Sequence, residues 1–193
     1  GIMLGPQGAV RITDVQKPAP GLYVHFGTVE RGMIATGDAV ELTVDATRRH
    51  DIMRNHTATH LLHRALRDVL GEHAEQKGSL VAPDRLRFDF NHLQGLTLDE
   101  LRAVEQRVNA WIRADEEVIP AEMPLMQARQ LGAMALFDEK YGDIVRMVSV
   151  GNDCGGAHTV ITTVDEAAEP TFCSRELCGG THVARTGEIG LFK

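Results

Sequence analysis

The stretch NHTATHLLH, residues 55–63, places two histidines, His56 and His60, four positions apart. In an α-helix, side chains at i and i+4 lie one above the other, so these imidazoles would point the same way. Apolar residues around them recur at helical spacing and predict a helix over residues 48–71 that ends near Gly71. His56, His60 and His63 fall opposite the apolar face, so we expect them to face away from the core.

A second stretch, CGGTH at residues 178–182, also carries two potential metal ligands four positions apart. Its two glycines allow the backbone to fold tightly enough for Cys178 and His182 to meet one ion. Three imidazoles and one thiolate suit tetrahedral zinc. The alternative for the helix alone is a solvated polar face. His63 is a competing partner for His60, whereas along the helix axis His63 lies too far from His56.

The echo CGGAH at residues 154–158 has the same spacing as CGGTH. Spacing therefore leaves open whether the site is closed by Cys154 and His158 or by the later pair. A metalloprotease is the rival use of two helical histidines, but it needs the pattern HExxH with glutamate as general base. Thr57 occupies that glutamate's position, so this rival fails.

Composition bounds the class of protein. The chain has 193 residues, a net charge of −7 and three cysteines, an odd number that argues against a disulfide framework. No apolar run approaches the roughly 20 residues of a membrane span, so we expect no membrane partner and a reducing, cytoplasmic location. An acidic chain is a poor nucleic-acid binder by itself. The chain starts at Gly1 rather than methionine, so we expect a piece of a longer protein.

The pattern predicts an α+β fold in two parts. Short alternating β runs separated by glycine and proline predict a small β-barrel over residues 1–49. Residues 50–193 should form an α+β domain whose helices pack on a mostly antiparallel sheet. A capping box at Thr97 and Glu100 predicts a second long helix. We further expect a helix over residues 127–134 and a last strand after Thr186 and Gly187.

Six motifs occur in the order typical of one family. The motifs are HTATH (56–60), QKGS (76–79), RLRFDF (85–90), GAMALF (132–137), EKYG (139–142) and ELCGGTH (176–182). On these motifs the chain resembles the editing domain of bacterial alanyl-tRNA synthetase, and residues 1–49 look like the translation-factor-like barrel that precedes it. Asp138 departs from the family's small residue, the segment between Gly151 and Thr171 is longer than expected, and the domain looks truncated at Lys193.

The resemblance implies hydrolysis of tRNA(Ala) mischarged with serine or glycine. It also implies zinc bound by His56, His60, Cys178 and His182. The partners would be the mischarged 3′ end of tRNA(Ala) and the remaining domains of the synthetase. Since no activating part is present, we expect no aminoacylation by this chain.

Serine must be told from alanine by a polar group near the ion. Gln76 is our first candidate, both for positioning the substrate and for binding it. Thr57 and Thr59 are further candidates for substrate binding. Cys178 is a second catalytic candidate, as a covalent nucleophile. This role is weaker, because a thiolate that binds the metal is already used as a ligand. Two other functions stay open: a free-standing deacylase acting in trans, and a non-catalytic zinc-stabilised tRNA-binding module. The related threonyl-tRNA synthetase editing domain is less similar, because the CGGTH and RFDF forms favour the alanine system.

Overall fold

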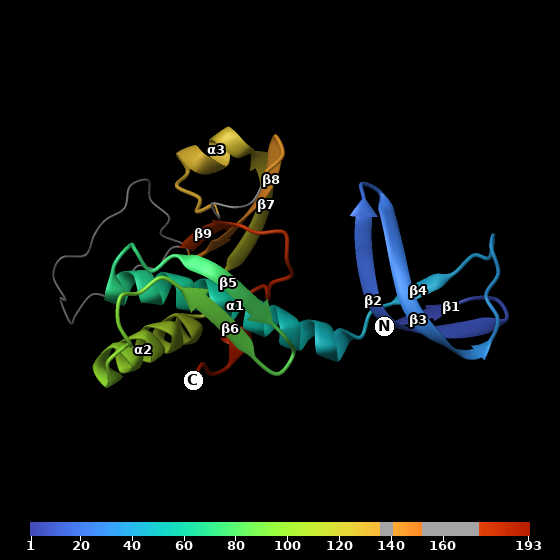
Figure 1. The fold of residues 1–193 in the computed structure, drawn as a ribbon, viewed down its shortest axis with the longest axis horizontal. Coiled ribbons are helices and arrows are strands. Elements are labelled where there is room, and N and C mark those ends of the chain that lie inside the picture. The colour runs from blue at the N-terminus through green and yellow to red at the C-terminus, as the bar shows by residue number, and fades with distance from the viewer. Residues whose placement is uncertain (136–140, 152–173) are drawn as a thin grey trace. The chain divides into compact units, whose positions relative to one another are not determined.

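The computed structural model describes residues 1–135, 141–151 and 174–193. The chain divides into two compact units, Gly1–Arg49 and His50–Lys193. Helices and antiparallel strands both contribute, so the expected α+β class is confirmed (Figure 1). No helix in these described ranges is long and apolar enough to cross a membrane.

The first unit is a four-stranded antiparallel sheet. Its strands are β1 (Ile2–Leu4), β2 (Gly8–Ala19), β3 (Leu22–Gly32) and β4 (Glu41–Thr43), in the order β3-β2-β1-β4. β2 and β3 form a long hairpin whose register shifts at three places. In this fully described unit β3 and β4 are sheet edges that do not pair with each other, so the expected barrel closure is not confirmed.

Helix α1 (Ala46–Leu70) carries the histidines and matches the predicted span closely. It begins where the Asp45 carboxylate accepts a hydrogen bond from the backbone N–H of Arg48, at 3.0 Å. This is the usual N-cap arrangement, which satisfies a backbone donor that the helix leaves unpaired. The helix ends at Gly71, whose φ of 107° suits glycine and stops the helical backbone.

The second long helix, α2 (Leu98–Ala114), begins at the predicted capping box. The Thr97 side chain accepts from the Glu100 backbone N–H, and the Glu100 carboxylate accepts from the Thr97 backbone N–H. Strands β5 (Gln76–Val81) and β6 (Leu86–Phe90) form an antiparallel hairpin between α1 and α2 in the chain.

A separate three-stranded antiparallel sheet follows in the order β7-β8-β9. It consists of β7 (Val118–Pro124), β8 (Ile144–Val150) and β9 (Ser174–Leu177). The predicted helix over residues 127–134 is shorter and earlier, since α3 covers Leu125–Gln130 and Gly132 then adopts a φ of 79°. The predicted last strand is wrong: a 3-10 turn, η1 (Thr186–Ile189), is followed by no strand up to Lys193.

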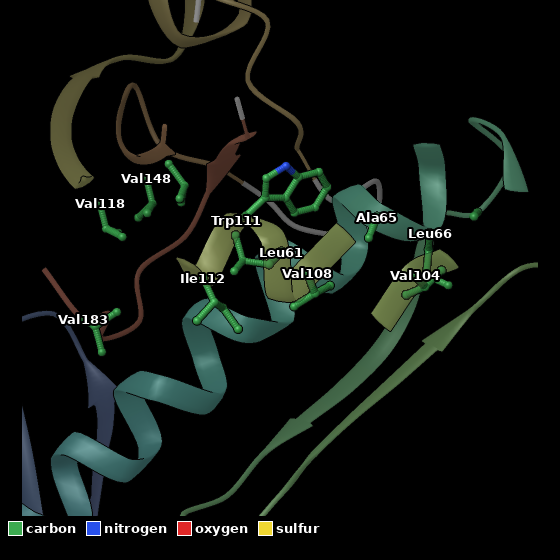
Figure 2. Packing of buried hydrophobic residues seen from close by; sticks show 12 residues of the cluster. Leu61, Ala65, Leu66, Val104, Val108, Trp111, Ile112, Val118, Val148 and Val183 are labelled. Carbon is green, nitrogen blue, oxygen red and sulfur yellow. The ribbon is translucent and has the colours of Figure 1, made fainter. Parts of the chain in front are cut away.

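One hydrophobic core joins α1, α2 and the β7-β8-β9 sheet. Leu61 of α1 and Val108 of α2 are completely buried in it, together with Val148 of β8 (Figure 2). Val183, just after the CGGTH loop, is buried in the same cluster. Truncating a buried leucine such as Leu61 to alanine costs about 2–5 kcal/mol of unfolding free energy. The core thus fixes the histidine helix and the end of the ligand loop relative to each other.

Candidate metal centre

Four side chains from distant parts of the sequence converge on one point. His56 and His60 come from α1, whereas Cys178 and His182 come from the loop after β9. One potential ligand atom from each lies within 4.8 Å of all the others. In the described part of the chain no other group of three or more such side chains is arranged this way.

The spacing of the donor atoms suits a tetrahedral ion. The Sγ of Cys178 lies 3.4 Å from His56 Nε2 and 3.4 Å from His182 Nε2. Nitrogen and sulfur bound to zinc at their usual distances lie about 3.5 Å apart along a tetrahedral edge. Three imidazoles and one thiolate are also the donors that zinc prefers, so the residues present fit this metal.

The ligand loop is attached to β8 at its start. The Cys178 backbone N–H donates to the Arg146 carbonyl at 3.0 Å, which continues the β8–β9 pairing one residue beyond β9. The Arg146 guanidinium donates to the carbonyls of Cys178 and Gly180, at 2.8 and 2.7 Å. Because Val183 is anchored in the core, both ends of the five-residue motif are fixed.

Gly180 permits the close approach of the loop to α1. A Cβ placed on Gly180 would lie 2.0 Å from Cε1 of His56, far inside van der Waals contact. A Cβ on the neighbouring Gly179 would meet no atom within 4 Å. The second glycine of the motif is therefore required by the packing against His56, and the first is not.

Two of the cluster histidines have a partner on the side away from the cluster. His182 Nδ1 lies 3.1 Å from the Thr57 hydroxyl, which also accepts a hydrogen bond from the Val183 backbone N–H. His60 Nδ1 lies 3.4 Å from a carboxylate oxygen of Glu176. Such contacts orient the rings of metal-binding histidines in other proteins.

The expectation that the histidines face away from the core is wrong for two of them. His60 and His63 are each only 4% exposed, because α1 is covered on this side by other parts of the second unit. His63 Nδ1 binds the other oxygen of Glu176, at 3.0 Å, and its ring contacts Phe88. Glu176 was not singled out from the sequence; its only signal there is its place in the ELCGGTH motif.

Burial lowers the basicity of the cluster. It lowers the pKa of His56 to about 4. The nearby His60 lowers this pKa further, and a backbone hydrogen bond at Thr181 opposes the shift by raising it. Burial lowers the pKa of His182 to about 2, again with His60 contributing, and it also lowers the pKa of His60. The imidazoles are consequently neutral at pH 7, which is the form that binds metal.

The structure places the three residues predicted to bind substrate in different surroundings. Thr57 is fully buried behind His182, and Thr59 is 4% exposed with its hydroxyl donating to the Asn55 carbonyl at 2.8 Å. Gln76 is half-buried at the start of β5, where its amide donates to the Ser79 hydroxyl at 3.1 Å. Cys154, His158 and Asp138 lie outside the described residues.

A cavity of about 440 Å³ lies elsewhere in the second unit. It is bordered by the first half of α1, the β5–β6 turn and the C-terminal residues, including Arg54, Asp84 and Arg85. None of the four cluster residues lines it. Its mixed charges make it a polar recess distinct from the cluster.

The C-terminal part of the chain matches a known class of synthetase-associated domain. Residues 145–193 match the family described as threonyl and alanyl tRNA synthetase second additional domain. The match includes all of β8 except its first residue, β9, and the loop that carries Cys178 and His182.

Over its whole length the chain is similar to alanine–tRNA ligases. It is 65% identical to the enzyme of Herpetosiphon aurantiacus over 193 residues, 60% to that of Roseiflexus castenholzii over 195, and 48% to that of Xanthomonas euvesicatoria over 193. Each match covers 100% of this chain and 20–22% of the relative. The resemblance to alanyl-tRNA synthetase is thereby confirmed, and the chain spans about a fifth of the length of these relatives.

Proposed function

We propose that the chain is the editing part of an alanine–tRNA ligase and hydrolyses tRNA(Ala) mischarged with serine or glycine. The observation that carries this proposal is the convergence of His56, His60, Cys178 and His182 in a chain similar throughout to alanine–tRNA ligases. The mischarged 3′ end of tRNA(Ala) would be the substrate, and the other domains of the synthetase would be its partners in the cytoplasm.

We assign the four side chains to Zn²⁺. When bound, the ion would polarise the ester carbonyl or lower the pKa of a water molecule. Catalytic zinc sites usually keep one position open, whereas four protein donors fill a tetrahedral shell. Cys178 therefore holds the ion rather than attacking the ester, and the cluster serves mainly to orient the substrate.

Gln76 is our proposed reader of the serine hydroxyl. Its amide nitrogen donates to Ser79, which orients the amide and leaves the carbonyl oxygen able to accept a hydrogen bond. A site that binds a hydroxyl can reject the analogue lacking it by roughly 10⁴–10⁵. Alanyl-tRNA, which lacks the hydroxyl, would then survive.

The test is deacylation of seryl-tRNA(Ala) by the zinc-loaded protein, in this chain and in a full-length ligase that contains it. Cys178→Ala should lower zinc affinity and hydrolysis by at least about 10-fold, the usual cost of disturbing a metal site. Cys154→Ala is the matched control and should leave both unchanged. If the wild type binds zinc but leaves seryl-tRNA intact, the chain is a binding module instead. Full activity and zinc content in Cys178→Ala would refute the assignment of this loop.

A further inference from the structure

Glu176 is a buried carboxylate placed between two histidines. It is 9% exposed and lies on β9, two residues before Cys178. One oxygen lies 3.0 Å from His63 Nδ1, and the other lies 3.4 Å from His60 Nδ1. Burying a carboxylate is costly in free energy unless the carboxylate is paired. Here both histidines are close enough to pair with it.

His60 has one nitrogen towards Glu176 and the other available to the cluster. Among the described residues His60 Nδ1 makes no hydrogen bond of normal geometry, and the Glu176 oxygen lies at ion-pair distance from it. Histidines that bind metal commonly donate their remaining N–H to a carboxylate, which fixes the tautomer and the ring orientation. Glu176 lies beside Nδ1 of His60 in the same way.

We propose that Glu176 is a positioning residue of the metal centre. Its carboxylate accepts the Nδ1–H of His60 and so reserves Nε2 for the metal. His63 is then not a competing ligand; it donates to the other oxygen and keeps the carboxylate in place. The inference rests on the proposed function only in that the four-residue cluster holds a metal.

The first experiment measures metal binding and not hydrolysis. Co²⁺ is titrated into wild-type protein, Glu176→Gln and the control Glu188→Gln, and the visible spectrum and dissociation constant are recorded. Glu188 is a suitable control because it also binds a histidine, His50, at 2.9 Å, but is not one of the four cluster residues. Gln has the shape of Glu but cannot accept from both histidines.

Glu176→Gln should weaken Co²⁺ binding by about 10–100-fold and shift the absorption bands. Its metal-free melting temperature should stay close to that of Glu188→Gln. Wild-type affinity and an unchanged spectrum in Glu176→Gln would overturn the inference, even if wild-type hydrolysis of seryl-tRNA is normal. Conversely, weakened binding would support it even if the wild type failed to hydrolyse seryl-tRNA.

A second measurement needs no substitution and decides the matter if Glu176→Gln does not fold. Two-bond ¹H–¹⁵N spectra of the zinc-loaded wild-type protein report which ring nitrogen of each histidine carries hydrogen. His60 should carry its proton on Nδ1 and bind zinc through Nε2. Zinc on Nδ1, or a proton on Nε2, would overturn the inference.

Discussion

Gln76 and the four cluster residues have different proposed roles. The hydrogen bond described for the Gln76 amide runs to Ser79. Reading the amino acid and holding the ion are thus assigned to different side chains. Substitutions should be able to change one without the other.

Changing Gln76 to Ala should leave zinc content unchanged while serine selectivity weakens. The amide would no longer meet the hydroxyl, so hydrolysis of seryl-tRNA(Ala) should fall by about 10-fold or more, the scale of one lost hydrogen bond of about 1.4 kcal/mol. The measurements are metal analysis and the ratio of seryl to alanyl ester hydrolysis. Ser79→Ala is a milder control, since it removes only the group that orients the amide. Loss of zinc in Gln76→Ala would contradict this division of roles.

The lowered histidine pKa values give the metal-free protein a defined response to acid. The pKa of His56 falls from 6.5 to about 4 on folding, and that of His182 to about 2. Between pH 6.5 and 5 the unfolded chain therefore binds protons that the folded chain does not. The free energy of unfolding must decrease as the pH falls, by at most about 1.4 kcal/mol per pH unit for each such histidine.

Urea unfolding of the metal-free protein at pH 7, 6 and 5 checks this prediction. The range lies above the ordinary carboxyl pKa, so acidic groups contribute little to the change. His56→Gln should show a shallower decrease, because glutamine does not titrate. A stability that is constant or rises towards pH 5 would show that these imidazoles are not buried in the neutral form.

At the scale of elements, the second glycine of the ligand loop decides how closely the loop approaches α1. Gly180→Ala would place a methyl group 2.0 Å from the His56 ring, so the ring or the loop must move out of the cluster. Zinc affinity should fall by about 10–100-fold, as for other losses of ligand orientation. Gly179→Ala should be neutral, because its methyl group meets no atom within 4 Å. Competition with a chelator measures both, and equal affinities for the two variants would contradict the packing.

Local signals in the sequence were sufficient for the two long helices and not for the surroundings of the cluster. The spacing of apolar residues and the box at Thr97 and Glu100 depend on neighbours within a few positions, so α1 and α2 were predicted correctly. The buried His63 is bonded to Glu176, which lies 113 positions away in the sequence. Helical periodicity carries no information about such a contact, so the histidine face was wrongly expected to lie away from the core.

For the whole molecule, we expect the first unit to be dispensable for metal binding, because the four cluster residues lie in the second unit. All four cluster residues, Glu176 and the main hydrophobic core lie within His50–Lys193. The first unit contributes residues 46–49 at the start of α1, and Asp45 is the N-cap of that helix. Loss of such a cap costs about 1 kcal/mol, so a shortened chain should begin at Asp45.

A chain of residues 45–193 should therefore fold and bind one zinc ion with the affinity of the whole chain, within about twofold. The reason is that the free energy of packing α1 and α2 against the β7-β8-β9 sheet is gained inside the second unit. Metal analysis, chelator competition and thermal unfolding of the two chains provide the comparison. If residues 45–193 unfolded or lost zinc, the boundary at Arg49 would separate parts of one cooperative structure, and the sheet of the first unit would be needed to maintain the metal centre.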